Sequence, residues 1–338
     1  MIEIRIREQE AGQRLDKFLK KYLSQAPRSF LYKMLRKKNI VLNGKKASGS
    51  EKLEKGDQVK FFLSEETMEK FRRNETVSLP EGIFRGPHPE ILYEDVNVLF
   101  LNKPSGMLSQ RASKEDLSVV EFVGWYLRES GALGEEELRA FQPAICNRLD
   151  RNTSGIIGAG KTLTGLQQLT ELFRERSIKK YYLCFAKGRI QKPAHIKGYL
   201  VKNEKTNKVR IQSGDQEGAL PIETEYRPIA VSKDTTLLKV RLITGRTHQI
   251  RAHLSGEGHP ILGDYKYGDR KWNETYKRTH GIKDQFLHAW RLQMPTLSGP
   301  LENLSQKTVT APVPEEFAEL IKETKWEHGI QEALEVLH

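Results

Sequence analysis

Short apolar runs of β type, separated by turns and interrupted by amphipathic helical stretches, dominate the chain from residue 89 onward. The β-type runs are EILYED, VNVLFLNKP, KYYLCFAKG, TTLLKVRLIT and AWRLQMP, and the helical stretches include VVEFVGWYLRES and LTGLQQLTELFRER. Strands and helices interspersed in this way are typical of an α+β domain. We therefore predict an α+β fold with a mixed or antiparallel sheet.

Length and composition limit the other possibilities. The 338 residues are enough for two or three domains, and 37% hydrophobic with 30% charged residues indicate a globular protein with a core. No apolar run approaches the roughly 18–20 residues that span a bilayer, and the N-terminus lacks the apolar core of a signal peptide. Cys146 and Cys184 are far apart and without histidines at metal spacing. We expect no disulfide framework, no zinc site and a cytoplasmic location.

The positive charge is concentrated near the N-terminus. Residues 12–63 contain 14 Lys and Arg against 4 Asp and Glu, whereas the rest of the chain has a net charge of only +2. A block this basic attracts a polyphosphate backbone through counterion release. A lysine-rich surface that only confers solubility is the alternative, but the concentration of charge favours nucleic acid.

This basic block also has a recognisable pattern of elements. An apolar stripe predicts a first helix, Ser29 is an N-cap candidate for a second, Asn43-Gly44 predicts a two-residue hairpin, and QVKFFL predicts a strand. The segments GQRLDKFLKKYL, SFLYKMLRKKNIVLNGKK and EKGDQVKFFL resemble the small S4-like RNA-binding domain, whose helix pair lies against structured RNA. By position, the resemblance implies that RNA is contacted by Arg28, Lys33, Arg36 and Lys37.

The stretch NRLDRNTSGIIGAGKT, residues 147–162, contains two competing sites. Its second half, GIIGAGKT, matches the phosphate-loop pattern G-x-x-x-x-G-K-[ST], which requires a buried strand ending at the first glycine. The preceding residues are polar and two isoleucines lie inside the supposed loop, so we predict an extended strand here instead. The first half surrounds Asp150 with Arg148 and Arg151, which favour an ionised, nucleophilic carboxylate. From these residues alone, a loop organised by surface ion pairs is an equal alternative.

Four ordered segments resemble the RluA-type pseudouridine synthases, which exchange the N–C glycosidic bond of a uridine in RNA for a C–C bond. The segment NRLDRNTSG matches the family signature H-R-L-D-x-x-T-S-G. The other three are VLFLNKPSGM at 98–107, IKKYYLCFAKG at 178–188 and LITGRTHQIRAHLSGEGHPILGDYKYG at 242–268. The resemblance covers residues 90–295 and is far more specific than the glycine pattern.

The resemblance implies roles for individual residues. Asp150 corresponds to the essential nucleophile, Arg251 to its arginine partner, and Tyr182 to the active-site tyrosine. The Tyr182 ring could stack on a flipped uracil, and its hydroxyl could help move the proton from the base carbon. Four more residues are expected to contact RNA: Arg148, Arg151, Lys103 and Arg246. The pocket is expected to be shaped by Lys103, Arg246 and Asp264. The reaction implies no cofactor and no metal, and attack at the ring or at the sugar carbon stays open.

One position departs from the family pattern, because Asn147 replaces the usual histidine before Arg-Leu-Asp. In the resemblance this position supports the loop, and an asparagine is still able to hydrogen-bond a backbone.

Together these features predict four regions: an S4-like α/β RNA-binding domain at 1–65, a linker at 66–88, a pseudouridine synthase catalytic domain at 89–325 and a C-terminal tail at 326–338. We predict an RNA pseudouridine synthase, an isomerase whose partner is RNA, with 23S ribosomal RNA favoured over transfer RNA. No membrane and no obligate protein partner is expected. Two alternatives are an RNA-binding protein of the same fold without catalysis and a phosphate-loop nucleotide hydrolase.

Overall fold

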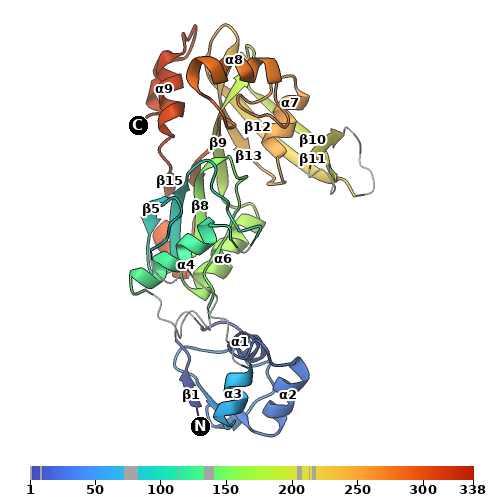
Figure 1. Ribbon diagram of the computed structural model, residues 1–338, viewed down its shortest axis with the longest axis vertical. Helices are drawn as coiled ribbons and strands as arrows, with labels where there is room; N and C mark the ends of the chain where they lie inside the picture. Colours follow the sequence, from blue (N-terminus) through green and yellow to red (C-terminus); the bar gives the residue numbers. More distant parts are fainter. Residues whose placement is uncertain are drawn as a thin grey trace.

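The computed structural model describes residues 2–7, 10–71, 83–113, 115–132, 141–203, 208–212, 214 and 218–338. Figure 1 shows the N-terminal block at one end of the long axis, with α4 and α6 beside the middle of the molecule and α7 and α8 at the other end. Within the described ranges, none of the helices has the length and apolar composition that crossing a bilayer requires.

The N-terminal block folds as a four-stranded sheet of order β1-β4-β2-β3 with three helices. The predicted hairpin is confirmed, because Asn43 and Gly44 both have positive φ, as a type I′ turn needs. The prediction of Ser29 as an N-cap is wrong: Pro27 precedes the helix, which begins at Arg28, so Ser29 lies inside it. The elements are β1 (Ile2–Arg5), α1 (Leu15–Tyr22), α2 (Arg28–Arg36), β2 (Ile40–Leu42), β3 (Lys45–Lys46), β4 (Gln58–Phe61) and α3 (Glu65–Phe71).

Eleven strands of the described chain form one mixed sheet, whose main path is β11-β10-β12-β13-β9-β14-β8-β6-β5. β14 and β8 run parallel, and all the other neighbouring pairs along this path are antiparallel, which confirms the predicted mixed sheet. The strands are β5 (Glu90–Glu94), β6 (Val98–Lys103), β7 (Ala144–Ile145), β8 (Ser154–Gly160), β9 (Lys179–Lys187), β10 (Ala194–Asn203), β11 (Lys208–Gln212), β12 (Leu220–Val231), β13 (Thr235–Leu242), β14 (Leu287–Gln293) and β15 (Thr308–Thr310).

Helices cover both faces of this sheet. Because side chains alternate along a strand, Tyr182 and Cys184 of β9 enter a core with α4 and α7, whereas Leu183 and Phe185 enter a core with α8, α9 and α10. The helices are α4 (Val119–Glu129), α6 (Leu163–Arg174), α7 (Gln249–Gly256), α8 (Arg270–His280), α9 (Glu315–Glu323) and α10 (Ile330–Glu335), with a 3₁₀ helix η1 (Gly299–Leu304).

Two of the expected regions contain more structure than the sequence indicated. The range 66–88 includes most of α3, whose Met68 is buried in the N-terminal core, and Phe84, which is buried in the core of the eleven-stranded sheet; residues 72–82 lie outside the described residues. The range 326–338 forms α10, where Ala333 and Val336 pack against α9. The four regional boundaries remain a proposal, with these segments assigned to the neighbouring cores.

The glycine pattern belongs to a buried strand. All seven residues of β8 are buried, as the sequence predicted from the two isoleucines, and Lys161 pairs with Glu94 instead of turning toward a loop. Gly155 has φ +111°, and a Cβ atom there would lie 2.2 Å from the carbonyl oxygen of Ala289. The glycine therefore allows β8 and β14 to approach closely, and a phosphate-binding loop is absent from this segment.

Candidate active site

The segment that contains Asp150 connects β7 to β8 and is held on several sides. The Ser109 hydroxyl accepts a hydrogen bond from the Leu149 N–H (3.0 Å) and donates one to the Leu149 carbonyl (2.7 Å). After the aspartate, the Thr153 N–H bonds back to the Asp150 carbonyl, and Gln285 donates to the Thr153 hydroxyl at 2.6 Å. These contacts keep the loop in place while the Asp150 side chain stays 26% exposed.

Asn147 performs the supporting role that the resemblance implied for its position. Its side-chain amide donates to the Ile156 carbonyl (3.1 Å), and its side-chain oxygen accepts the Gly158 N–H (2.8 Å). Both partners are backbone groups of β8, so the prediction that this asparagine hydrogen-bonds the backbone is confirmed. The loop is thereby anchored three residues before Asp150.

Lys103 is buried against the loop that contains Asp150. Its ammonium is 0% exposed and donates to the carbonyls of Pro104 (2.9 Å), Met107 (2.8 Å) and Arg151 (2.8 Å). Three carbonyls use all three of its donors. The prediction that Lys103 contacts RNA is therefore wrong, because its buried ammonium donates to these three carbonyls and so supports the loop that contains Asp150.

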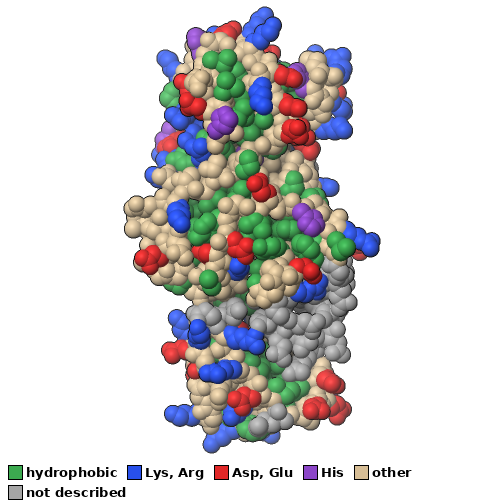
Figure 2. All heavy atoms as spheres, turned by 90° about the vertical axis from the view of Figure 1, so that its left-hand side faces the viewer, with side chains coloured by type: hydrophobic (Ala, Val, Ile, Leu, Met, Phe, Trp, Pro, Cys, Tyr) green, Lys and Arg blue, Asp and Glu red, His purple; other side chains and the backbone are tan. Residues whose placement is uncertain are grey.

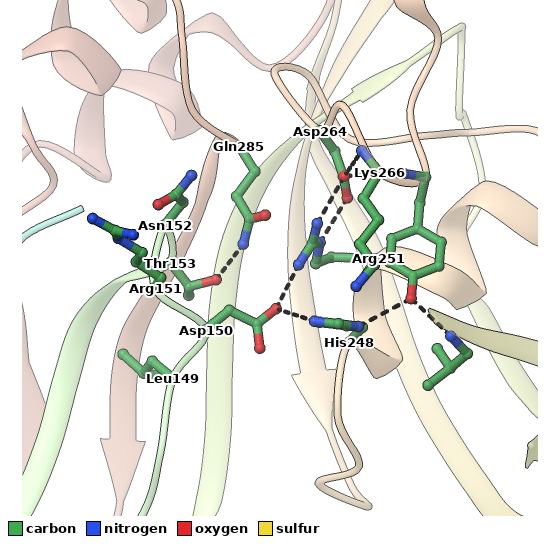
Figure 3. Close-up of polar contacts among 12 residues, drawn as sticks. Leu149, Asp150, Arg151, Asn152, Thr153, His248, Arg251, Asp264, Lys266 and Gln285 are labelled. Atoms are coloured by element: carbon green, nitrogen blue, oxygen red, sulfur yellow. Dashed lines mark hydrogen bonds and ion pairs between the residues drawn. The ribbon is translucent and has the colours of Figure 1, made fainter. Parts of the chain in front are cut away.

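Arg251, on α7, joins two carboxylates. Its guanidinium donates two bonds to Asp264 (2.7 and 2.8 Å) and one, from Nη1, to Oδ2 of Asp150 (2.7 Å), as Figure 3 shows. Burial disfavours the charged guanidinium, but the two carboxylates outweigh it and the pKa of Arg251 is raised. Burial likewise opposes ionisation of Asp264, but Arg251 and the backbone N–H groups of Tyr267 and Lys266 lower its pKa. The arrangement keeps Arg251 charged and aimed at Asp150.

A cavity of about 610 Å³ opens over this pair. Tyr182 is buried in its wall, and burial followed by the nearby Asp150 raises the pKa of its phenol. Of the expected RNA contacts, Arg148 and Arg246 line the cavity, and the Arg246 Nε is a buried donor for which the described chain provides no hydrogen-bond partner. The volume is within the range of small-ligand sites.

Arg151 does not join this group. Its Nε donates to the Gly106 carbonyl at 3.0 Å, and Figure 3 shows the side chain directed away from the carboxylate. From their flanking positions, the ionised Asp150 is predicted to be stabilised by Arg148 and Arg151. The guanidinium that contacts Asp150 is instead that of Arg251, from 101 residues further along the chain.

Two residues beside Asp150 were not predicted from sequence. No site role is predicted for His248 from the sequence, yet its Nε2 lies 3.8 Å from Oδ2 of Asp150. The Tyr267 hydroxyl lies 3.0 Å from the other ring nitrogen of His248. Both residues lie in the longest segment that resembles the family, residues 242–268. That resemblance could have indicated a site role for them, whereas no local pattern does. In the described ranges, no three His, Cys, Asp or Glu side chains gather as a metal site would require.

Comparison with known proteins identifies the family of the chain. The family model described as RNA pseudouridylate synthase matches residues 97–256, and the S4 domain matches residues 13–59. The ribosomal large subunit pseudouridine synthase C of Vibrio vulnificus is 32% identical over 325 residues, covering 94% of each chain. The protein of the same name from Escherichia coli K12 is 35% identical, covering 84% of this chain and 85% of its own.

A solved structure shows the same fold. The structure titled Human RNA Pseudouridylate Synthase Domain Containing 4 aligns with a TM-score of 0.54 at 22% identity, over 73% of this chain and 92% of its own. This likeness supports the fold alone, whereas the sequence relatives extend over nearly the whole chain. The chain belongs to the RNA pseudouridylate synthase family.

Proposed function

We propose that this RNA pseudouridine synthase modifies uridines of large-subunit ribosomal RNA, with Asp150 as its nucleophile. The observation that carries the proposal is the Asp150 carboxylate, bonded to a buried arginine and facing a cavity of about 610 Å³. Relatives named as ribosomal large subunit enzymes, and the basic N-terminal block, support ribosomal RNA as the substrate.

The chemistry needs no co-reactant, because the reaction is an isomerisation. The bond between N1 of uracil and C1′ of ribose breaks, a bond between C5 and C1′ forms, and the proton that leaves C5 is matched by one taken up at N1. A uridine inside folded RNA must first be flipped out of its stack to reach the site. Asp150 then attacks either the uracil ring or C1′, and both routes fit a carboxylate with one oxygen bonded to Arg251.

Tyr182 supplies one wall for the flipped base in this proposal. Its ring is buried beside Asp150, and its raised pKa keeps the hydroxyl protonated at neutral pH. A protonated phenol donates a hydrogen bond, and its ring is able to stack on uracil. Help with the C5 proton requires a base that first accepts the phenolic proton, so stacking is the role that the burial of Tyr182 favours.

RNA contacts outside the cavity are proposed for the second helix of the N-terminal block. All four are exposed: Arg28, Lys33, Arg36 and Lys37. Figure 2 views this block from the side of β1 and shows further Lys and Arg side chains there, among Asp and Glu. Each phosphate contact that is lost should reduce the slope of log affinity against log salt by roughly 0.7–0.9. Replacing all four by alanine should therefore flatten the salt dependence, and an unchanged slope would count against this surface.

The test of the nucleophile is Asp150→Asn, which keeps the shape of the side chain and removes its charge. The variant should form no pseudouridine in target RNA, while Asp234→Asn, on an exposed turn far along the sheet, should retain the wild-type rate. Mapping pseudouridines in ribosomal and transfer RNA from cells that lack the protein would identify the substrate. A site lost from transfer RNA alone would contradict the ribosomal assignment.

A further inference from the structure

His248 has an uncommon backbone conformation beside the reactive carboxylate. It precedes α7 with φ 53° and ψ 19°, in the left-handed region. Residues other than glycine are uncommon there, and such strain persists where the surroundings hold the residue in place. Figure 3 shows the imidazole directed toward Asp150 on one side, and its other ring nitrogen contacts the Tyr267 hydroxyl. A histidine restrained in this way suggests a function for the ring.

Hydrogen bonding by Tyr267 favours one tautomer of the His248 ring. The Tyr267 hydroxyl accepts the N–H of Val209 from β11 (2.9 Å) and lies 3.0 Å from Nδ1 of His248. Because a backbone N–H can only donate, the hydroxyl of Tyr267 keeps its own proton available for donation to Nδ1. Nδ1 then acts as an acceptor, and a neutral ring has its proton on Nε2, which is the nitrogen that faces Oδ2 of Asp150 at 3.8 Å.

We propose that His248 is a positioning residue, which donates from Nε2 to Asp150 and is held in the required tautomer by Tyr267. The inference rests on the proposed role of Asp150 as nucleophile. It adds a second donor to the one from Arg251, on a different side of the same carboxylate oxygen.

A second donor has a clear purpose in this geometry. One bond from Arg251 leaves the carboxylate able to turn about its Cβ–Cγ bond, whereas two donors on Oδ2 restrict that rotation. The described contacts of the side chain all use Oδ2, and Figure 3 shows the other oxygen without a partner among the residues drawn. Catalytic hydrogen bonds are often long before the substrate is bound and shorten in the complex. The 3.8 Å separation fits a bond that forms as the uridine enters.

The electrostatic surroundings favour a neutral donor. Burial lowers the pKa of His248, and the cations Arg251 and Lys266 lower it further, against the opposing effects of Asp150 and Asp264. A neutral imidazole orients the carboxylate by a hydrogen bond without adding another full positive charge beside it. The carboxylate therefore keeps more of its nucleophilicity than it would next to a second cation.

Two substitutions at position 248 isolate the donor. His248→Gln keeps a side-chain N–H at a similar distance from the backbone, whereas His248→Leu has similar bulk and no donor; both bear the same left-handed backbone strain. The single-turnover rate at saturating enzyme should fall about 10- to 100-fold for the leucine variant and by no more than about threefold for the glutamine variant. The Kd for RNA, measured separately, should be unchanged in both.

Tyr267→Phe tests the tautomer, because it removes the hydroxyl that bonds Nδ1. Its rate should lie between those of the glutamine and leucine variants of His248, with an unchanged Kd. His195→Leu is the matched control. His195 contacts Glu223 elsewhere on the sheet, so its substitution should leave the single-turnover rate unchanged. Equal rate losses for His248→Gln and His248→Leu would indicate a structural role and overturn the proposal, as would a wild-type rate for the leucine variant.

Asp150→Asn in the same assay separates the two levels of inference. If Asp150→Asn is inactive while His248→Leu turns over at the wild-type rate, only the positioning role fails. If Asp150→Asn retains the wild-type rate, the nucleophile assignment fails and the positioning role fails with it. Thermal melting of every variant identifies a rate loss that comes from unfolding.

Discussion

Arg251→Met would show how much of the site depends on one buried guanidinium. The arginine side chain is 9% exposed and that of its bidentate partner Asp264 is 1% exposed. Removing the arginine leaves Asp264 charged and buried, which costs about 3–5 kcal/mol of the free energy of unfolding. The same change removes the charge-assisted bond to Asp150, worth about 1.5–3 kcal/mol, so the single-turnover rate should fall roughly 10- to 150-fold.

The double variant Arg251→Met, Asp264→Asn separates these two effects. An asparagine is neutral and its oxygen still accepts the N–H groups of Lys266 and Tyr267, which now bond Oδ1 of Asp264. About half or more of the lost free energy of unfolding should return, because no buried charge is left unpaired. The rate should stay low, since no guanidinium orients Asp150.

Urea unfolding followed by tryptophan fluorescence measures the free energy of unfolding, because Trp272 and Trp290 are buried. Release of tritium from C5 of the target uridine measures the single-turnover rate. Arg189→Met is the matched control: it breaks an ion pair with Glu327 in which both side chains are about 40% exposed, so the change should be below about 1 kcal/mol. Recovery of the rate in the double variant, or an unfolding free energy unchanged in Arg251→Met, would refute the reasoning.

Three further predictions concern stability and are all measured by urea unfolding. Gly155→Ala should lower the free energy of unfolding by about 2–4 kcal/mol because its Cβ would meet the backbone of β14. The control Gly256→Ala, in open helical surroundings, should be neutral or slightly stabilising. Similar free energies of unfolding for both variants would contradict the steric explanation. Lys103→Met should cost about 2–4 kcal/mol by removing the buried ammonium that three carbonyls share, and a neutral effect would show that water replaces the ammonium. Burial lowers the pKa of His253 and His288 from 6.5 to about 4, so the unfolded chain binds more protons between these values. The free energy of unfolding should therefore fall as the pH drops from 6.5 to 4, by up to roughly 3 kcal/mol per histidine, and a flat profile in this window would be inconsistent with buried neutral rings.

Local patterns in the sequence predicted much of the secondary structure. The apolar stripe that became α1, the Asn43-Gly44 turn and the β-type runs that became β5, β6, β9, β13 and β14 all express preferences of neighbouring residues. Ser29 shows the limit of such rules: it is a favoured N-cap residue, but the observed N-cap is Pro27, two residues earlier, and α2 begins at Arg28. The glycine pattern shows the same limit, since its eight letters match a phosphate loop and only their flanks and isoleucines indicated a strand.

The sequence by itself also identified the three residues of the proposed chemistry, Asp150, Tyr182 and Arg251, because each lies in a segment whose order of residue types resembles one family. It determined the basic character of residues 12–63 as well, since charge is a property of composition. Only the tertiary structure decided which side chains meet. Arg251 contacts Asp150 from 101 positions further along the chain. The ammonium of Lys103 donates to carbonyls of its own loop and of residue 151. One ring nitrogen of His248 lies near Asp150 and the other lies near the Tyr267 hydroxyl. These contacts depend on how β8, α7 and β11 are brought together by the sheet, and no spacing within any one segment encodes that geometry.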